Sequence, residues 1–503
     1  MFRRRWALAD ALVLGAVAFL IVVASVMSAG GRSSDTQTRL SVRPAAPGRP
    51  VPAGFLGLSL EYPAVERYAG TDPTALNPVF LQLVRNIAGP APMLRIGGDS
   101  ADWTWWPVAQ LSRPPGVTYS LTPRWLAVTR RLTDALDARL MLGLNLEADS
   151  TDVALAEASA LSGALGRSAV QAYELGNEPE LYGAFPWYRT ASGQPVYGRS
   201  RGYGFSAFTQ DVTRFAAALP NLPLAGPAVS GPRWTQDLGR FIAAEPQLHV
   251  VTLHHYPLQL CFAPRSSPAY PTVAHLLTGE ASTGLAQRFA PGAAIANAHG
   301  LPLRVDELNT VSCGADAAVS QTFASALWAL DTLFEMVRAG VDGVNIHTFP
   351  GAGYDLFSFT EAHGRWTATV APEYYGLLMF AQATPPGSRL LSVSGAQPAG
   401  LLKTWATIAP DGRVRFVAIN KDTLRPRVVS LRTPRATGSA SLERLKAPSA
   451  ASASPVTLAG WSFGSQTETG LPAPRPARLG MSGGRFVVSL PPGSAALLTV
   501  PVR

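Results

Sequence analysis

Hydrophobic residues in this chain fall into eight short runs, and stretches with helical spacing of apolar residues lie between them. The runs are 55–60, 93–96, 140–146, 172–175, 222–225, 250–253, 303–305 and 344–346. Apolar runs of this length, each ending in a polar or glycine-rich turn, predict buried strands. Helices are predicted at 125–138, 153–165, 205–218 and 321–339. Eight strands alternating with helices predict a parallel (β/α)8 barrel, because each parallel pair needs a crossover connection.

The helical pattern stops near residue 385. Segments 414–420 and 486–490 read as strands, and turns rich in Gly, Pro, Ser and Thr surround them. We therefore predict a C-terminal β-sandwich over 385–503, behind a barrel over 51–384. Residues 32–50 are predicted to be a linker, with a possible sandwich strand near residues 38–42. A chain of 503 residues is long enough for a barrel and a smaller module.

The composition excludes a disordered chain, because 47% of the residues are hydrophobic and 15% are charged. The formal charge is +9, from 42 Lys and Arg against 33 Asp and Glu. Only Lys403, Lys421 and Lys446 are lysines, which favours a genomic bias towards arginine over a polyanionic partner as the cause of the charge. No basic run is interleaved with aromatic residues, and we expect no nucleic-acid partner.

Three arginines at positions 3–5 precede an uncharged stretch from residue 11 to residue 31. This order is typical of a secretory signal peptide or a membrane anchor, and both interpretations of residues 1–31 stay open. In both, positive charges before the apolar run place the rest of the chain outside the cytoplasm. We expect a protein that is secreted, or held at the membrane through its N-terminal segment.

The chain has two cysteines, Cys261 and Cys313. Outside the cytoplasm they can form a disulfide, which would tie the loops after the sixth and seventh strands together. The alternative is two buried free thiols. Two isolated cysteines supply no zinc or iron–sulfur spacing, and we expect no metal and no organic cofactor.

Two glutamates follow predicted barrel strands, where barrel enzymes place their reactive groups. Glu178 follows the fourth strand in Leu-Gly-Asn-Glu-Pro, and Glu307 follows the seventh in Val-Asp-Glu-Leu-Asn. Strands four and seven lie on opposing sides of an eight-membered ring, so the two carboxyl groups would face each other. Cleavage of a glycosidic bond needs such a pair, one group to protonate the leaving oxygen and one to attack the anomeric carbon.

Each glutamate also has an ordinary structural interpretation, as a solvated loop carboxylate or an ion-pair partner. Asp306 adjoins Glu307, so a shift of one residue in strand register would exchange the two side chains. Glu174 lies four residues before Glu178 and on the same side of the strand, and we interpret it as a buried structural charge.

Further motifs surround the glutamates: Leu-Arg-Ile-Gly-Gly-Asp-Ser at 94–100, His-His-Tyr at 254–256 and Gly-Ala-Gly-Tyr at 351–354. With the glutamates 129 residues apart (307 − 178), they make the chain resemble clan A of the retaining glycoside hydrolases. Within that clan it resembles family 79, the β-glucuronidase and heparanase family, over roughly residues 45–500. The resemblance implies the (β/α)8 barrel and the sandwich, with Glu178 as acid/base and Glu307 as nucleophile.

The resemblance also implies how the sugar is bound. Tyr256 would hydrogen-bond the nucleophile, and His255 would line the sugar site. Gly351, Gly353 and Tyr354 would hold a uronate carboxylate, since glycines let backbone N–H groups approach an anion closely. The further candidates for contacts to sugar hydroxyls are Asn177, Glu61 and Asp99.

These features predict a retaining β-glycosidase acting on β-linked glucuronic acid in glycans or glycosides. One alternative is another specificity of the same clan, such as β-xylosidase, β-glucosidase or arabinofuranosidase, because the glutamate pair does not distinguish them. A second is a non-catalytic protein that binds envelope polysaccharide and retains the barrel. The partner expected in all three is a carbohydrate.

Overall fold

The structure is a computed structural model that describes residues 37–43, 48–395 and 400–503. The predicted signal peptide or anchor at residues 1–31 lies outside the described residues. Within the described ranges, no helix combines the length and the apolar character that crossing a membrane requires.

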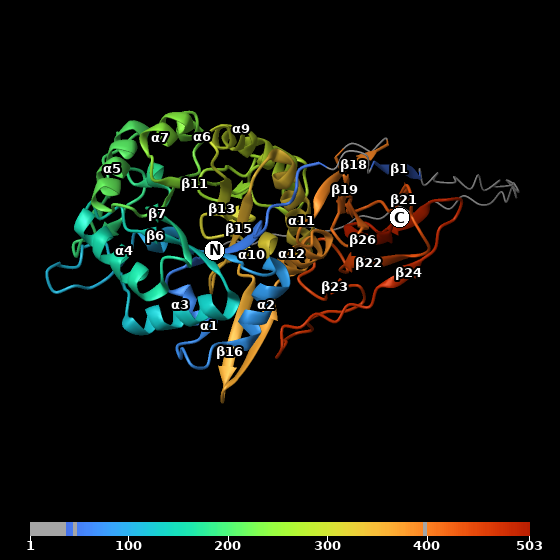
Figure 1. Cartoon of the computed structure of the whole chain (residues 1–503), viewed down its shortest axis with the longest axis horizontal. Helices are drawn as coiled ribbons and strands as arrows, with labels where there is room; N and C mark the ends of the chain where they lie inside the picture. The colour runs from blue at the N-terminus through green and yellow to red at the C-terminus, as the bar shows by residue number, and fades with distance from the viewer. Residues whose placement is uncertain (1–36, 44–47, 396–399) are drawn as a thin grey trace, which may run out of the picture. The chain divides into compact units, whose positions relative to one another are not determined.

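Eight parallel strands close into a barrel (Figure 1). They are β2 (Leu56–Glu61), β3 (Met93–Gly97), β6 (Arg139–Leu144), β7 (Val170–Leu175), β10 (Leu224–Val229), β11 (Leu248–His254), β13 (Leu303–Leu308) and β15 (Gly343–His347). Each predicted apolar run overlaps one of them, so the (β/α)8 barrel is confirmed. The runs are almost continuously apolar because parallel strands in a barrel are covered on both faces.

Helices surround this barrel. They are α1 (Ala64–Ala69), α2 (Pro78–Ala88), α3 (Pro123–Leu136), α4 (Thr151–Leu165), α5 (Phe205–Ala218), α6 (Pro232–Thr235), α7 (Leu238–Ala244), α8 (Val273–Leu276), α9 (Leu285–Ala298), α10 (Ala317–Ser320), α11 (Phe323–Ala339) and α12 (Pro372–Ala383). Polar side chains begin several of them. The Thr122 hydroxyl accepts the N–H of Trp125 at the start of α3, and Ser150 accepts that of Val153 at the start of α4.

Shorter elements shape the loops around the barrel. They are the single turns η1 (Gly98–Ala101), η2 (Pro179–Leu181) and η3 (Glu280–Gly284) and the strand pairs β4 (Thr104–Trp105) with β5 (Tyr119–Ser120), β8 (Tyr188–Arg189) with β9 (Pro195–Val196), β12 (Leu258–Gln259) with β14 (Val311–Ser312), and β16 (Phe357–Ala362) with β17 (Arg365–Val370).

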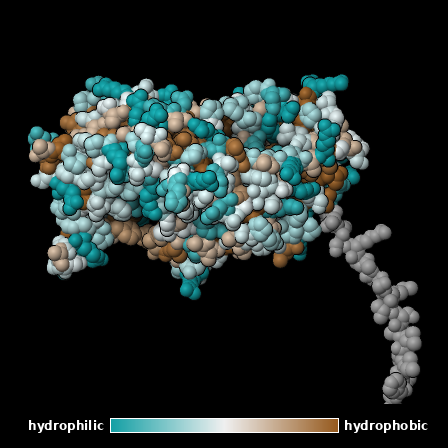
Figure 2. All heavy atoms as spheres, turned by 90° about the horizontal axis from the view of Figure 1, so that it is seen from below, coloured by the Kyte–Doolittle hydropathy of each residue, from teal (hydrophilic) through white to brown (hydrophobic). Residues whose placement is uncertain are grey.

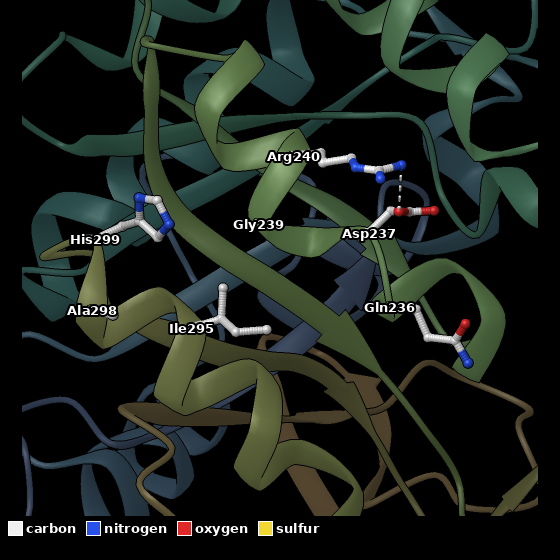
Figure 3. Close-up of a pocket in the computed structure, with 7 residues that line it drawn as sticks. All are labelled: Gln236, Asp237, Gly239, Arg240, Ile295, Ala298 and His299. Carbon is white, nitrogen blue, oxygen red and sulfur yellow. Dashed lines mark ion pairs between the residues drawn. The ribbon is translucent and has the colours of Figure 1, made fainter.

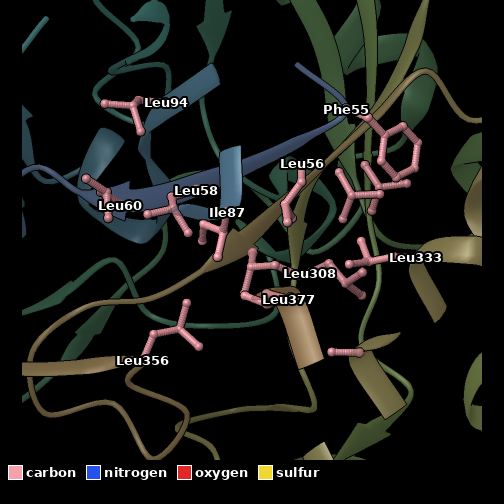
Figure 4. Packing of buried hydrophobic residues seen from close by; sticks show 14 of the residues in the cluster. Phe55, Leu56, Leu58, Leu60, Ile87, Leu94, Leu308, Leu333, Leu356 and Leu377 are labelled. Atoms are coloured by element: carbon pink, nitrogen blue, oxygen red, sulfur yellow. The ribbon is translucent and has the colours of Figure 1, made fainter. Parts of the chain in front are cut away.

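Strand and helix side chains form one hydrophobic core. Leu58 and Leu60 on β2 and Leu308 on β13 are fully buried, together with Ile87 on α2 and Leu377 on α12 (Figure 4). Burial of a leucine side chain is worth roughly 1.5–3 kcal/mol. On the face displayed in Figure 2, by contrast, apolar residues are interspersed with polar ones.

The remaining strands form a ten-stranded, mostly antiparallel sheet. Its members are β1 (Thr38–Arg43), β18 (Arg389–Ser394), β19 (Leu402–Ile408), β20 (Arg413–Asn420), β21 (Arg427–Arg432), β22 (Ala440–Lys446), β23 (Thr457–Leu458), β24 (Ala477–Leu479), β25 (Phe486–Leu490) and β26 (Ser494–Pro501). Strands from both halves of the sheet contribute to one buried apolar cluster. The sheet therefore folds over its own core as a sandwich, and β1 joins it from the far end of the chain, between β18 and β21.

Two of the three lysines of the chain lie where the sandwich meets the barrel. The Lys421 ammonium is 2.6 Å from the Asp331 carboxylate of α11, and neither side chain is exposed. Lys403 on β19 pairs with Glu335, one turn further along the same helix. In Figure 1, α11 and α12 lie on the side of the barrel that adjoins β19 and β26.

Candidate active site

The two predicted glutamates meet at the mouth of the barrel. An oxygen of Glu178 and an oxygen of Glu307 lie within 4.8 Å of each other. Glu307 is on β13 and is 7% exposed. Glu178 follows β7 with a φ of 46°, in the left-handed region, and its N–H donates to the Ala228 carbonyl of β10. Such strain in a non-glycine residue is typical of functional sites.

Gly176 makes this turn possible. Its φ is +75°, and a Cβ atom there would lie 2.1 Å from the Tyr182 hydroxyl oxygen. That hydroxyl donates to Asp102, whose carboxylate also accepts the N–H of Asn177. The backbone that presents Glu178 is therefore fixed by close packing and by a buried carboxylate.

Arg95 on β3 organises the floor of the site, and its side chain is completely buried. Its guanidinium donates at 2.7 Å to Glu307, at 2.8 Å to Glu174 and at 2.8 Å to the side-chain oxygen of Asn177. A buried carboxylate is tolerated when it is paired and hydrogen-bonded, and Arg95 does this for two of them. Glu174 is thus buried and paired with Arg95, and burial raises its pKa to about 7.

Burial alone would raise the pKa of Glu307. The positive charges of His347, His254 and Arg95, with the Arg95 hydrogen bond, outweigh burial and hold its pKa well below the ordinary range. The Tyr256 hydroxyl donates to the other carboxylate oxygen at 2.9 Å. Glu307 is therefore held ionised and oriented, as a nucleophilic carboxylate must be.

The structure gives the two histidines of the pair different partners. His254, the last residue of β11, faces the site, and its Nδ1 lies 3.4 Å from Glu178. The neighbouring His255 hydrogen-bonds the backbone of Ser230 instead, and burial followed by the charge of Arg288 lowers its pKa to about 4. His255 lies one residue beyond the end of β11, and the contact with Glu178 is made by His254.

Asp306 enters the site together with Glu307. It lies 3.3 Å from His254 and 3.5 Å from Arg95, with no exposed surface. The pairing of β11 with β13 goes from Leu253 and Val305 directly to His254 and Glu307, so Asp306 is an extra residue in the ladder. A bulge of this kind re-aims side chains, which is why two adjacent carboxylates both reach the interior.

Glu61 and Asp99 lie beside this centre. Glu61 accepts the N–H of Ser100 at 2.8 Å and lies 3.3 Å from His347 of β15. Asp99 accepts from the Asn177 amide at 3.1 Å. Asp99 is exposed to solvent, although many protein atoms surround it. Desolvation by these atoms, and then the negative charges of Glu61 and Glu307, raise the pKa of Asp99. Because the side chain also contacts solvent, the desolvation effect is weaker than full burial would give.

The loop after β15 brings Tyr354 into the site but turns its glycines elsewhere. Tyr354 is 6% exposed and hydrogen-bonds Tyr256, with the two ring centroids 6.0 Å apart. The Gly351 N–H is directed at the Asp355 carboxylate, 3.4 Å away. A Cβ atom on Gly353 would lie 2.9 Å from that of Ala315, so this glycine packs on a neighbouring loop.

Cys261 and Cys313 form a disulfide, with their Cα atoms 5.8 Å apart. The strands that precede them, β12 and β14, also pair with each other. The loops after β11 and β13 are therefore tied together, close in sequence to Tyr256 and Glu307.

No family model matches the chain, and no curated protein sequence is significantly similar to it. Several solved structures are similar to this chain. Three of them, each covering 92% of its length, are described here. The 4-O-α-L-rhamnosyl-β-D-glucuronidase of Fusarium oxysporum is 17% identical, with a TM-score of 0.63 over 100% of that chain. The GH51 arabinofuranosidase of Xanthomonas axonopodis pv. citri is 16% identical, with a TM-score of 0.65 over 99%. A glycoside hydrolase family 30 subfamily 8 xylanase of Clostridium acetobutylicum is 13% identical, with a TM-score of 0.54 over 100%.

The chain has the fold of these glycoside hydrolases. At such low identity the similarity concerns the fold alone, and the comparisons do not single out family 79.

The same side chains can be tested as metal ligands. Within the described residues, two groups of three bring one ligand atom each within 4.8 Å of one another: Glu174, His254 and Asp306, and Glu178, His254 and Glu307. Both share His254, and Arg95 already donates to a carboxylate of each group. A divalent cation beside that guanidinium would meet repulsion, so the donor set suits ion pairs better than a metal.

An open cavity of about 500 Å³ lies elsewhere, between α7 and α9 on the outside of the barrel (Figure 3). Its walls include the exposed ion pair of Asp237 and Arg240, together with Ile295 and His299. None of the candidate site residues lines it, and we assign it no part in the chemistry.

Four residues of the site are absent from the sequence-based prediction: Arg95, His254, Asp306 and His347. Arg95 had a signal, since an arginine within a buried apolar strand needs a carboxylate partner. His347 ends β15 as Glu307 nearly ends β13, so its place at a strand end was also a signal. The sequence offers Asp306 only as an alternative to Glu307, because the bulge that brings both inward has no signal in the sequence.

Proposed function

We propose that this protein is a retaining glycoside hydrolase that works by double displacement. The observation that carries the proposal is the approach of Glu178 and Glu307 to within 4.8 Å. Retaining enzymes hold their two carboxyl groups about 5–5.5 Å apart, whereas inverting enzymes leave about 6.5–9.5 Å for a water molecule. The names of the three solved structures described above, a glucuronidase, an arabinofuranosidase and a xylanase, support the same assignment.

The geometry gives each glutamate a role. One Glu307 oxygen is held by Tyr256 and the other by Arg95, so the carboxylate can attack the anomeric carbon and form a glycosyl ester. Glu178 protonates the leaving oxygen as that bond breaks. In the second step Glu178 takes a proton from water, which releases the sugar with its original configuration.

Purified protein should be assayed on a panel of aryl glycosides with Glu178→Gln and Glu307→Gln. Both variants should lose most of their turnover of substrates with poor leaving groups. Glu178→Gln should retain more activity on dinitrophenyl glycosides, because a good leaving group needs no proton. Azide should then replace water in Glu178→Ala and give a glycosyl azide of retained configuration.

The matched control is Glu180→Gln, which alters a carboxyl two residues away that binds the backbone of Ser230 and Gly231. It should remain active. Near wild-type turnover in both Glu178→Gln and Glu307→Gln would overturn the assignment. Binding without turnover by the wild-type protein on every glycan tested would favour a non-catalytic polysaccharide binder.

For the substrate we propose a β-linked glucuronide. The Gly-Ala-Gly-Tyr segment supports it through Tyr354, whose hydroxyl reaches Tyr256 beside the nucleophile. The fold similarity to the Fusarium rhamnosyl-glucuronidase supports it as well. The Gly351 N–H gives no support for a glucuronide, because it already points at the Asp355 carboxylate.

The panel should therefore pair glucuronides with glucosides, xylosides and arabinofuranosides. Tyr354→Phe should reduce kcat/KM for the glucuronide more than for the glucoside, because only the uronate has a carboxylate to hold. Equal losses, or a wild-type preference for a neutral sugar, would assign the protein to another specificity with the same glutamate pair.

We also propose that the protein acts outside the cytoplasm, secreted or anchored through residues 1–31. The order of charge and hydropathy in that segment supports this, and so does the disulfide, because disulfides persist in oxidising compartments. Fractionation of cells that express the full chain tests it, and recovery with the cytoplasmic proteins would contradict it.

A further inference from the structure

A buried row of titratable side chains lies beneath the candidate catalytic pair, and the double-displacement steps do not use it. His254 Nδ1 is 3.4 Å from Glu178, and His254 Nε2 is 3.3 Å from Asp306. Glu174 of β7 lies beside Asp306 and accepts at 2.6 Å from the Thr252 hydroxyl. The side chains of His254, Asp306 and Glu174 have no exposed surface.

We propose that Asp306 is a positioning residue: it holds His254 as a protonated hydrogen-bond donor aimed at Glu178, so that the three side chains act as one unit. This inference rests on the proposed function, because it assigns Glu178 the role of acid/base. Asp306 and Glu174 touch neither sugar nor water in it, and they act only through the histidine.

The contacts of Asp306 are consistent with a role that acts through His254. Neither of its oxygens accepts a hydrogen bond of good geometry from a backbone N–H or a side-chain donor, although both are buried. Its close contacts are His254, Arg95 and Glu174. A buried carboxylate without hydrogen-bond donors is costly unless charged partners compensate it. The bulge in β13 that turns Asp306 inward thus places a negative charge behind the imidazole.

Charges around His254 favour its protonated form. Facing it are Glu174 and Glu178 from the β7 segment and Asp306 and Glu307 from β13, and Arg95 of β3 contacts three of these four carboxyl groups. The adjacent β10, Leu-Ala-Gly-Pro-Ala-Val, has no titratable side chain. Burial lowers the pKa of His254, but Asp306 first, then Glu178 and Glu307, raise it well above its usual value.

The consequence for the reaction follows from the charge on Glu178. When Glu178 gives its proton to the leaving oxygen it becomes a carboxylate, and the protonated His254 then donates to an anion rather than to a neutral acid. Hydrogen bonds to charged groups are the stronger ones. The unit therefore assists proton release in the first step, while the imidazole keeps its own proton.

The experiment compares kcat/KM against pH for the wild-type protein, Asp306→Asn, His254→Asn and the double variant. Loss of the cation beside the general acid should move the alkaline limb of the profile up by about one pH unit. Below that limb the rate should fall about tenfold, because the acid is weaker. KM should change less than kcat. Because one unit is disrupted in each case, the double variant should lose no more than either single variant.

The matched control is Glu157→Gln, which alters a buried carboxyl on α4 that accepts the N–H of Asn145. Its pH profile should keep the wild-type shape. A merely structural role for Asp306 would instead lower the rate equally at every pH, and that result would overturn the proposal. So would losses in the double variant that are the sum of the single ones.

Two measurements keep the proposal separable from folding and from the proposed function. If Asp306→Asn does not fold, ¹⁵N-histidine NMR of the full chain, which has seven histidines, reports the state of His254 directly. A neutral His254 in the wild-type protein at pH 7 would refute the proposal. A wild-type protein that cleaves no glycoside would refute the proposed glycosidase function. If Glu178→Gln loses activity but the pH profiles of the Asp306 and His254 variants do not shift, only the proposed role of Asp306 and His254 is refuted.

Discussion

Replacing Lys421 with methionine should weaken the attachment of the sandwich to the barrel. The Lys421 ammonium lies 2.6 Å from Asp331 and 2.9 Å from the Ser282 hydroxyl, and both members of the ion pair are fully buried. Methionine fills most of the same volume but removes the charge, so Asp331 would remain buried with less compensation. Breaking a buried ion pair by removing one partner typically costs 3–5 kcal/mol.

The structure places the expected loss at the lower end, about 3 kcal/mol. Asp331 would still accept from the indole N–H of Trp405 at 3.0 Å, and the Lys403 ammonium lies 4.0 Å away. The assay is urea unfolding followed by tryptophan fluorescence and by circular dichroism. The control is Lys446→Met, which removes the one exposed lysine of the chain and should leave the midpoint unchanged.

A second variant tests the cause. In Lys421→Met/Asp331→Leu no uncompensated charge remains, and part of the lost stability should return. The pH dependence has a definite sign. Burial raises the pKa of Asp331, but Lys421 and Lys403 outweigh it and lower the pKa. The pair therefore stabilises the fold above the unfolded-state pKa of about 3.9 and loses this effect as the pH falls. Wild-type stability in Lys421→Met, or a double variant weaker than the single one, would refute the reasoning.

Three further predictions concern the site and its support. Gly176→Ala should severely reduce folded yield and activity together, because its Cβ atom would meet the Tyr182 hydroxyl at 2.1 Å with φ at +75°; a fully active variant in circular dichroism and turnover assays would contradict this. The acid limb of the pH–rate profile should lie below about pH 4, the ordinary carboxyl range, because Glu307 keeps its charge there; an acid limb near pH 6 would count against Glu307 as the nucleophile. Serine at both Cys261 and Cys313 should lower thermal stability by about 2–4 kcal/mol, measured by calorimetry, and unchanged stability would show that the paired loops need no covalent link.

The barrel could be predicted because its physical cause is local. A parallel strand covered on both faces needs apolar side chains at consecutive positions, so each strand is visible as a run. One strand is longer than predicted: β10 continues to Val229, although the hydrophobic pattern predicts its end near Ala225. The Gly-Pro at 226–227 reads as a strand terminator. Pairing with β7 ends at Ala225, and Pro227 lies where only β11 remains as a partner.

The candidate site could be predicted where side chains follow from position in the barrel. Glu178 and Glu307 belong to this group, because one follows the fourth strand of the ring and the other lies near the end of the seventh. Their partners depend on register instead. A choice between His254 and His255, or between Asp306 and Glu307, requires the alignment of β11 with β13, and that alignment is set by contacts among residues about 50 positions apart.

Two backbone irregularities that the sequence does not predict, the bulge at Asp306 and the left-handed turn at Glu178, lie at the candidate active site. One physical requirement accounts for both. Side chains of a regular strand alternate between its two faces. In a regular β13, therefore, only one of Asp306 and Glu307 would point into the barrel. The proposed mechanism needs a nucleophile and, beside it, a charge that orients a histidine, and this arrangement requires a break in the alternation, which the bulge at Asp306 supplies. The left-handed turn at Glu178 meets the same need on the opposite side. Both irregularities lie toward the carboxyl ends of β7 and β13, in a barrel that is closed by eight paired strands. The regular barrel can therefore hold the strained backbone in place, and substitutions that restore ideal geometry at these two points should gain stability only by losing the alignment of the carboxyl groups.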